Sequence, residues 1–417
     1  MANTPLSPVR GVFLFCGSVA AVFKPVYFYQ TDRQSNTRRE IIMKKKHQAV
    51  FAAAAIFAFA LIAACNNTGS GSAKPEGDGR APESSFMELK YATGFSVEYL
   101  ENGVKIVTDA ENQKFLLVPR GQEAPSGYED MTVLAIPLQK AVFGSTTHVG
   151  MIAPFDVWDC VAGITSAQGT NPEMDKDIAE SGCDIKYLGS WSAPDYELMQ
   201  LINPDLVFVY TGTSALTELI AMLESLGIPY AVNNEYMEAR HEGRMEWQLF
   251  FAPFFGIDDE AVKYVSEQFA KLDEMNAVIA NVVDKPKIAY GSIYQGTVYV
   301  SGPDSFVANQ VRAAGGEFLH ETPGQLSFEE FFDTLANADL WILSMNENSV
   351  ANYNALLAMV PVLEDSQVVV DKKIWQFHVG YWYFTDQLAD QVLDLAAIFH
   401  PGLFPGREPF HYHPLAE

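Results

Sequence analysis

The sequence predicts an α/β protein in which two lobes, each built on a helix-covered parallel sheet, are joined by one long helix and preceded by a small β element. Two observations carry this prediction. From about residue 133 onward, short apolar runs alternate with segments of helical period, and the alternation occurs in two separate sets. Between the two sets, residues 258–283 form one unbroken stretch of helical periodicity.

The first element along the chain is an export signal. Met43 is followed by three lysines and then by an apolar run over residues 49–64, which is short for a membrane span but typical of a secretory signal. The run closes with small residues and Cys65, an ending that resembles a bacterial lipobox. That resemblance implies cleavage before Cys65 and acylation of its thiol, and two or three acyl chains anchor a protein stably. The alternative is an ordinary signal peptide with an incidental cysteine.

Residues 1–42 do not fit this signal. We interpret them as a misassigned gene start, so that translation begins at Met43 and residues 43–64 are the lipoprotein signal peptide. The alternative is a membrane segment around residues 11–30, which Lys24 interrupts. We expect a periplasmic, membrane-anchored lipoprotein, because residues 66–69 lack the acidic cluster that resembles a surface-export signal.

The charge of the exported part excludes one class of partner. Residues 1–64 hold eight of the 27 Lys and Arg and two of the 52 Asp and Glu, which leaves 19 basic and 50 acidic residues and a formal charge of −31. Such a surface repels nucleic acid. Cys160 and Cys183 could form a disulfide or remain two buried thiols, and their spacing matches no metal-binding cysteine pattern. We expect a monomer.

Two segments precede the main body. Residues 65–85 are rich in Gly, Ser, Asn and Pro and predict a flexible tether. Residues 86–135 predict the small β element, since apolar runs at 95–99 and 104–107 flank Asn102 and Gly103, the pair favoured in a type I′ hairpin turn. Residues 115–118 add another strand.

The main body divides into a first lobe over residues 136–256, a bridging helix over 257–285 and a second lobe over 286–417. The strands expected in the first lobe are 141–143, 161–164, 205–210 and 230–232, with a helix over 218–226. The strands expected in the second lobe are 287–290, 340–343 and 368–370, with helices over 307–314 and 328–336. In the bridging helix Asp258 is the expected N-cap, and Pro286 ends the pattern.

No motif signals catalysis. The sequence contains no GxGxxG, Walker A, GxSxG or HExxH pattern. The glycine-rich pieces at residues 144–145 and 315–316 lack phosphate-loop spacing and suit ordinary strand–helix turns. We therefore expect a binding protein and not an enzyme.

Several segments, taken in order and spacing, resemble the periplasmic substrate-binding proteins of ABC importers for vitamin B12 and ferric siderophores. These segments are residues 188–197 (LGSWSAPDYE), 201–207 (LINPDLV), 225–229, 246–255, 301–305, 309–311 and 315–316. The ending, residues 398–405 with Tyr412, is similar to that of lipoprotein members from Bacteroidetes. The resemblance covers about residues 138–415.

The resemblance implies two Rossmann-like lobes, a rigid bridging helix and a ligand captured between the lobes and delivered to a permease whose ATPase drives release. The implied ligand is a small-molecule chelate of iron or cobalt: a ferric siderophore, cobalamin or another cobamide, or haem. No covalent cofactor and no resident metal is expected. The acidic–basic pair of the B12-binding member has no counterpart in residues 381–386, and cations at strand ends are scarce, although Arg240 and Arg244 lie near one loop.

Ligands of open α/β folds bind at the carboxyl ends of the parallel strands. Aromatic side chains with scattered hydroxyls at these ends suit a large, flat, partly apolar ligand. The resemblance places Trp191 and Tyr210 as groove aromatics, and the alternative is that both are core residues. The predicted ligand contacts are Thr146, Thr147, His148, Trp191, Tyr210, Thr213, Tyr236, Tyr294, Gln295 and Trp382.

Members of this family present one acidic residue on each lobe to the permease. By position the candidates are Glu218, near the start of the helix after Thr213, and Glu329 or Glu330 in residues 328–336. Acidic side chains near helix N-termini are favourable in themselves, so a capping role is the alternative.

Two other functions remain open. Related two-lobe binders capture bare Zn²⁺ or Mn²⁺ with three histidines and a carboxylate, and the histidines available here are His148, His241, His320 and His378. The second is an anchored enzyme on a doubly wound fold, for which the sequence offers nothing that resembles a nucleophile–base set.

Overall fold

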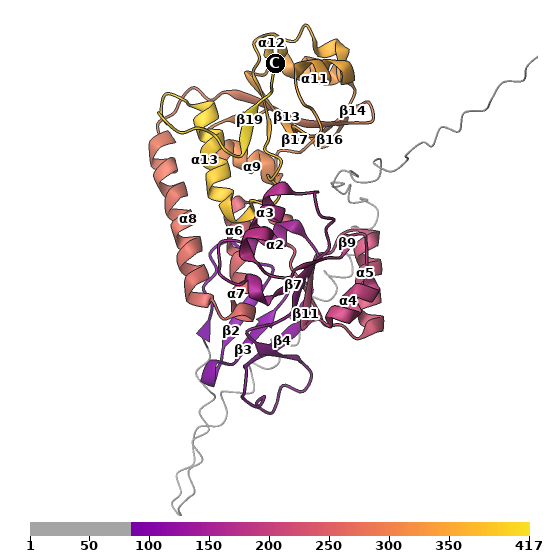
Figure 1. The fold of residues 1–417 in the computed structure, drawn as a ribbon. Coiled ribbons are helices and arrows are strands. Elements are labelled where there is room, and N and C mark those ends of the chain that lie inside the picture. The colour runs from indigo at the N-terminus through magenta and orange to yellow at the C-terminus, as the bar shows by residue number, and fades with distance from the viewer. Residues whose placement is uncertain (1–84) are drawn as a thin grey trace, which may run out of the picture. The chain divides into compact units, whose positions relative to one another are not determined.

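The short apolar runs of the sequence become parallel strands, and the computed structural model describes residues 85–417, shown in Figure 1. These residues belong to one compact unit, Arg80–Glu417. The predicted misassigned start, the signal peptide, Cys65 and the tether up to residue 84 lie outside the described residues. In the part of the chain that is described, no helix is long and apolar enough to cross a membrane.

The strands are β1 (Ser85–Phe86), β2 (Ser96–Tyr99), β3 (Lys105–Thr108), β4 (Lys114–Pro119), β5 (Thr132–Ile136), β6 (Ala141–Phe143), β7 (Val161–Ile164), β8 (Lys186–Tyr187), β9 (Gly189–Ser190), β10 (Ala193–Pro194), β11 (Leu206–Val209), β12 (Tyr230–Val232), β13 (Lys287–Tyr294), β14 (Thr297–Val300), β15 (Glu317–Phe318), β16 (Gly324–Leu326), β17 (Leu340–Asn346), β18 (Ile374–Phe377) and β19 (Tyr412–Pro414).

The α-helices are α2 (Thr146–Ile152), α3 (Pro172–Ser181), α4 (Tyr196–Ile202), α5 (Ser214–Leu226), α6 (His241–Glu246), α7 (Gln248–Phe255), α8 (Asp258–Ile279), α9 (Phe306–Ala313), α10 (Phe328–Leu335), α11 (Tyr353–Met359), α12 (Gln367–Val370) and α13 (Leu388–Phe399). Short 3₁₀ helices are η1 (Glu101–Gly103), η2 (Trp158–Cys160), η3 (Glu235–Met237), η4 (Pro361–Leu363) and η5 (Thr385–Gln387).

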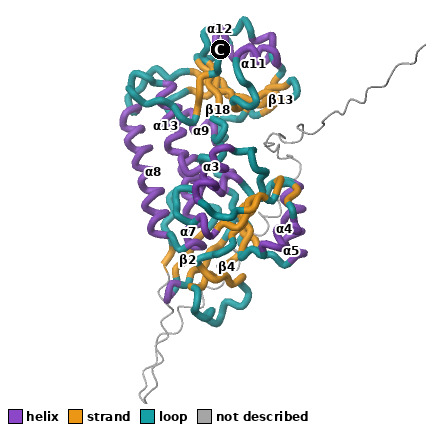
Figure 2. The backbone as a smooth tube through the Cα atoms, in the orientation of Figure 1, coloured by secondary structure: helices purple, strands orange, loops and turns teal. Residues whose placement is uncertain are grey.

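The first lobe is a parallel sheet in the order β12-β11-β6-β7-β8 with a helical layer on each face. Strand β11 shows why both layers form, because its side chains alternate between the two faces. Val207 and Val209 pack in the cluster that contains Leu216 and Leu219 of α5. Phe208 faces the other way, with its ring 5.2 Å from that of Phe254 on α7. Figure 2 shows the strands with α4 and α5 on one side and α7 on the other.

The second lobe is a mixed sheet in the order β16-β14-β13-β17-β18-β19, with β15 also paired to β13. Strands β15, β13, β17 and β18 are parallel, whereas β14, β16 and β19 run antiparallel to their neighbours. One face packs against α8, α9 and α13, and the other against α10, α11 and α12. The predicted fold class, two helix-covered lobes joined by a long helix, is confirmed.

One predicted strand of the second lobe is wrong. Residues 368–370 form part of the short helix α12, and the strand beside β17 is β18, four residues later. Val368 and Val369 are buried while Val370 is 59% exposed, a pattern that fits one helical turn and not a central strand. Lys372, with φ of 55°, then turns the chain into β18.

The amino-terminal β element is a full sheet in the order β1-β2-β3-β4-β5. The predicted hairpin between β2 and β3 is confirmed, and both Asn102 and Gly103 have the positive φ that a type I′ turn requires, although a longer loop containing η1 connects the strands. One face of the sheet packs on α7, with the Phe115 ring 6.0 Å from that of Phe254. The other face is covered by the loop that carries Tyr128 and Met131.

The bridging helix is α8, and it packs against α7 of the first lobe and α13 of the second. The predicted N-cap is wrong, because Asp258 is the first helical residue and makes no cap. Its carboxylate instead accepts hydrogen bonds from the Tyr99 hydroxyl (3.1 Å) and the Lys105 ammonium (2.5 Å) of the amino-terminal sheet. The helix also ends at Ile279, four residues before the predicted end.

The carboxylate of Glu246, at the end of α6, fastens the segment before β2 to the first lobe. It accepts hydrogen bonds from three consecutive backbone N–H groups, those of Lys90 (2.8 Å), Tyr91 (2.7 Å) and Ala92 (2.7 Å). The Glu246 carboxylate is buried, and these hydrogen bonds offset the cost of taking its charge out of water.

We predict that Glu246→Ala lowers the free energy of unfolding by about 2–3 kcal/mol, because three N–H groups, one buried and two partly buried, lose a charged acceptor. Urea denaturation followed by circular dichroism measures this. Glu180→Ala, on the exposed face of α3, is the matched control and should change stability by no more than about 0.5 kcal/mol. Equal losses in the two variants would contradict the anchoring role of Glu246.

Candidate ligand-binding site

A row of aromatic side chains lies at the carboxyl end of the first lobe's sheet. The ring of Tyr210, directly after β11, lies 6.2 Å from that of Trp191 and 5.9 Å from that of Tyr236. Tyr236 donates its hydroxyl to the carbonyl of Thr211 at 2.9 Å. Trp191 is 37% exposed, so its indole offers an open face at one end of the row. The structure thus brings three of the predicted contact residues together.

Beneath this row a buried histidine lies next to a buried carboxylate. His148, on α2, is fully buried, and its Nε2 lies 3.3 Å from Oε2 of Glu235. The Thr147 hydroxyl donates to the other oxygen, Oε1, at 2.8 Å. Burial raises the pKa of Glu235, but the hydrogen bond and charge of His148, with smaller effects of Arg244 and Thr147, outweigh it and lower the pKa below its usual value. Glu235 therefore stays ionised and holds His148 and Thr147 in place.

A second group of aromatic side chains lies at the carboxyl end of β18 in the second lobe. Phe377 and Tyr381 stack with their ring centroids 3.8 Å apart, and Trp382 lies edge-on to Tyr381 at 5.1 Å. Tyr381 is buried and its hydroxyl lies 3.1 Å from that of Tyr412. Trp382 is 48% exposed, so the second lobe also presents an indole.

Arg244, on α6, contacts both lobes. Its guanidinium donates to the backbone carbonyls of Tyr236 (2.6 Å) and Glu238 (3.0 Å) in the first lobe. The same guanidinium lies 3.6 Å from the ring centroid of Phe306, on α9 of the second lobe. Burial lowers its pKa to about 10, against the opposing charge of Glu235 and the nearby Tyr381. Among the described residues, no carboxylate forms an ion pair with Arg244.

Four predicted contact residues lie at other positions and belong to neither aromatic group. Thr146 begins α2, and Thr213 caps α5 by accepting the N–H of Leu216. Tyr294 and Gln295 lie at the tip of the antiparallel hairpin that extends β13 into β14, where Gln295 has a φ of 47°. The prediction treated the end of β13 as a parallel strand end, but β13 continues beyond the parallel part of the sheet.

The histidines considered as metal ligands are engaged separately. His148 pairs with Glu235, His241 lies 3.6 Å from Glu242, and His320 Nε2 accepts the N–H of Tyr290 at 3.1 Å. His378 Nδ1 accepts the N–H of Gly380 at 2.9 Å. Within residues 85–417, no group of three or more His, Cys, Asp or Glu side chains is placed to hold a metal ion. Cys160 and Cys183 are free thiols.

The glutamates predicted to contact a permease differ in their surroundings. Glu218 is exposed on α5, and Glu329 is exposed at the start of α10. Glu330 is part of a capping box, since its carboxylate accepts the N–H of Ser327 at 2.7 Å while the Ser327 hydroxyl accepts the N–H of Glu330. Glu330 therefore caps α10, as the alternative interpretation expected, whereas Glu329 remains a candidate for contact with the permease.

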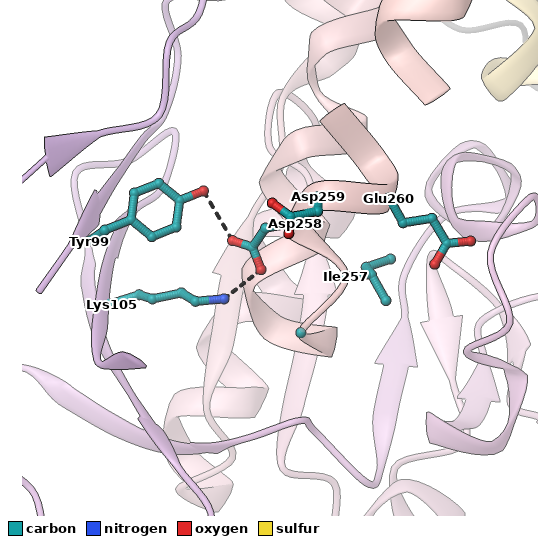
Figure 3. A pocket seen from close by; sticks show the side chains of 7 residues that line it. Tyr99, Lys105, Ile257, Asp258, Asp259 and Glu260 are labelled. Carbon is teal, nitrogen blue, oxygen red and sulfur yellow. Dashed lines mark hydrogen bonds and ion pairs between the residues drawn. The ribbon is translucent and has the colours of Figure 1, made fainter. Parts of the chain in front are cut away.

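A hollow of about 400 Å³ lies away from the strand ends, where the amino-terminal sheet meets α8. Figure 3 shows Tyr99 and Lys105 pointing toward Asp258 within it. The remaining lining residues are Gly256, Ile257, Asp259 and Glu260. Because Tyr99 and Lys105 of the sheet both bind Asp258 of α8, the contacts in this hollow join the two elements.

Two residues of the site were not predicted from the sequence. Glu235 follows β12, but the residue predicted to contact the ligand at this strand end was its aromatic neighbour, Tyr236. A carboxylate at a strand end was the signal that could have indicated it. Arg244 was noted only as lying near a loop, because its contact with the second lobe joins residues 62 positions apart in the chain.

One parallel and one mixed sheet joined by a long helix, with aromatic side chains at strand ends of both lobes and an arginine that contacts both, define a two-lobed ligand-binding protein. The comparisons agree with this class. Residues 142–371 match the family model described as periplasmic binding protein, and the chain belongs to that family.

The chain is similar in sequence to an uncharacterised lipoprotein of Methanocaldococcus jannaschii, with 28% identity over 355 residues. The alignment covers 77% of this chain and 83% of the relative. Among solved structures, the molybdate periplasmic binding protein of Haemophilus influenzae has a TM-score of 0.55 at 15% identity, over 72% of this chain and 92% of that one. A periplasmic haem-binding protein from Pseudomonas aeruginosa has a TM-score of 0.52 at 15% identity, over 67% and 98%. At such identities the two structures establish the fold alone.

Membership of the family fixes the broad role. Its members are substrate-binding proteins of transporters, so the chain is a binding protein and not an enzyme. They work with ABC transporter permeases and bind small ligands. The similarity to lipoproteins of Bacteroidetes in particular stays a prediction, since the relative described above comes from another organism.

We predict that Glu235→Gln lowers the free energy of unfolding by about 3 kcal/mol at pH 7, because it leaves His148 without its charged partner in a buried position. The pKa of Glu235 is lowered in the folded protein, so its pairing stabilises the fold above the unfolded pKa near 4.5 and is lost as the pH falls. The difference between wild type and variant should therefore shrink toward pH 4.

Urea denaturation at pH 7 and pH 4 measures this difference. Glu274→Gln, on the exposed side of α8, is the control and should have little effect at either pH. A Glu235→Gln deficit that is equally large at pH 4 would show that packing, and not charge, is what the substitution removes.

Proposed function

We propose that this chain captures an anionic chelate of iron or cobalt between the strand ends of its two lobes and delivers it to an ABC permease in the same membrane. Acylation of Cys65 would anchor the chain on the periplasmic side, where it acts as a monomer. The observation that carries the proposal is that each lobe exposes an indole at its strand ends, Trp191 and Trp382, while Arg244 contacts both lobes and forms no ion pair among the described residues.

The aromatic side chains favour a large, flat ligand. Trp191 and Trp382 each expose a large fraction of the indole, and each is held by a second aromatic residue behind it, Tyr210 and Tyr381 respectively. Indole faces supply contact area at low entropic cost because few torsions must be fixed. Haem, corrins and aromatic siderophores present surfaces of this kind.

The charge at the site favours a ligand with a negative edge. Among the described residues Arg244 forms no ion pair, although the charges of Glu235 and Glu238 act on it, and an anionic group of the ligand would further offset the cost of its burial. The rest of the exported chain carries a large excess of acidic residues, which disfavours anions everywhere else on the surface. A carboxylate or phenolate of the chelate would therefore select this position.

We predict that one class of chelate raises the melting temperature of the protein. A ligand present at 100 times its Kd adds about 2.7 kcal/mol of apparent stability. The panel comprises haem, a ferric catecholate, ferric citrate, neutral cyanocobalamin and a cationic ferric hydroxamate. We expect a shift of several degrees with an anionic member, and no shift with any chelate in the panel would contradict the proposal.

We predict that Trp191→Ala and Trp382→Ala each weaken binding of that chelate by about tenfold or more, since each removes an aromatic contact. Arg244→Met should weaken the anionic chelates selectively. A purely structural loss at Arg244, which also holds the carbonyls of Tyr236 and Glu238, would weaken anionic and neutral chelates alike. Calorimetric titration separates the two cases, and Phe410→Ala, an exposed aromatic outside the two groups, is the control.

We predict that Glu218→Lys and Glu329→Lys reduce ligand transport into proteoliposomes bearing the permease, while leaving the Kd of the chelate unchanged. Both carboxylates are exposed, one on each lobe, and reversal of their charge would oppose basic pockets on the permease. Glu330→Ala is the complementary test, because loss of the capping box should lower stability by about 1 kcal/mol with little effect on transport. Transport that survives both Lys substitutions would contradict these docking positions.

A further inference from the structure

One short segment of the second lobe, residues 383–386, reaches three different helices. The Tyr383 hydroxyl donates to Asp177 of α3 at 2.5 Å, and the Thr385 hydroxyl donates to the carbonyl of Thr147 in α2 at 2.6 Å. Asp386 accepts a hydrogen bond from the Tyr264 hydroxyl of the bridging helix α8 at 3.1 Å. We name residues 383–386 the junction segment, since they join the second lobe to the first lobe and to the bridging helix.

The junction segment is packed too tightly to slide. Gly150 of α2 lies directly against it, and a Cβ atom at that position would come within 1.7 Å of the Tyr383 carbonyl oxygen. Tyr383 itself is only 2% exposed. Relative movement of the lobes at this point therefore requires the contacts of the segment to open, because close-packed surfaces do not deform continuously.

Asp386 is a buried acidic residue within this packed segment. It is 5% exposed, and among the described residues no Lys, Arg or His forms an ion pair with it. Lys271 of α8 and Arg407 both pair with Asp390 of α13. A buried carboxylate with only hydrogen bonds for support is costly in its ionised form.

The groups that face the junction add further negative charge. Asp177 of α3 acts on Asp386, and Asp390 of α13 and Glu267 of α8 act on its partner Tyr264. Glu173 of α3 acts on Tyr383 in the same way. The side chain of Gln387 donates a hydrogen bond to Asp386 and so favours its ionised form.

Together these effects favour the neutral, protonated form of Asp386. Burial, with a smaller contribution from Asp177, raises the pKa of Asp386 to about 7, although the hydrogen bonds from Tyr264 and Gln387 oppose the rise. Burial also raises the pKa of Tyr264 and of Tyr383 well above the ordinary value, so both hydroxyls remain donors near neutral pH.

We propose that the junction segment is a proton-controlled joint between the lobes, closed when Asp386 is neutral and opening more often when Asp386 is ionised. The neutral acid tolerates burial against Tyr264, whereas the carboxylate regains water only when the segment separates from α2, α3 and α8. The freedom of the two lobes to move therefore depends on the pH of the compartment. This inference does not depend on which ligand the protein carries.

The expected pH dependence follows from linkage. In the opened joint Asp386 faces water and its pKa returns to about 4, so opening releases a proton between pH 4 and 7. The opening equilibrium constant then rises by roughly eightfold from pH 5 to 6 and by only about twofold from pH 7 to 8. A raised carboxyl pKa stabilises the closed joint below its own value, and that stability is lost as the pH rises through it.

Hydrogen–deuterium exchange of the whole chain, in the regime limited by the opening equilibrium and corrected for the intrinsic pH dependence of exchange, tests the proposal. The peptides to follow cover residues 146–152 and 383–388. We expect exchange there to accelerate from pH 5 to 7 and to level off above pH 7. In Asp386→Asn the acceleration should disappear, whereas Asp273→Asn, an exposed carboxylate of α8, should behave as wild type. A flat profile in wild type, or an unchanged slope in Asp386→Asn, overturns the joint.

Tyr264→Phe supplies a second check that does not depend on Asp386→Asn folding. It removes a hydrogen bond that favours the ionised carboxylate, so the acceleration should move to higher pH. Exchange that accelerates at the same pH as in wild type, or at a lower one, contradicts the proposal.

Discussion

The rest of the structure depends on the contacts that Arg244 and Glu246, both on the short helix α6, make with backbone groups. The two side chains lie two positions apart, have opposite charge and bind backbone groups of different segments. Glu246 accepts the N–H groups of residues 90–92 and so attaches the amino-terminal sheet. Arg244 donates to the loop after β12 and stacks on Phe306 of the second lobe. The short helix α6 therefore holds three parts of the molecule in place: the amino-terminal sheet, the loop after β12 and the second lobe. The same contacts position the aromatic row, because Tyr236 belongs to that loop.

Much of the fold could be predicted from the sequence because its strands are short, apolar and regularly separated by helices. β6, β7 and β12 have the predicted bounds, and the buried positions of α8 follow the predicted spacing. The errors arose where tertiary contacts overrode local pattern. Residues 368–370 have strand-like composition but complete a helical turn, and Asp258 looks like an N-cap but binds Tyr99 and Lys105. Asp258 is recruited by strands about 150 residues earlier, which no local pattern contains.

The site was only partly predictable for the same reason. Aromatic residues after strand ends could be found from sequence, so Trp191, Tyr210, Tyr236 and Trp382 were named, and the structure places each of them in an aromatic group. The net charge of the site could not be predicted from the sequence, because it depends on which charged side chains form pairs in the folded protein. His148 turns out to be buried against Glu235. Arg244 forms no ion pair within the described chain, and under the proposed function it would give the site its preference for an anion. The aromatic residues would then select the shape of the ligand and the arginine its charge.

The central claim is that the strand ends of both lobes hold one ligand. Hydrogen–deuterium exchange of the chain with and without a saturating ferric chelate tests it most directly, since protection maps the contact surface. The account predicts added protection in residues 189–192, 210–213 and 235–238 of the first lobe together with residues 380–383 of the second. Protection confined to one lobe, or centred on the hollow beside Asp258, would contradict it.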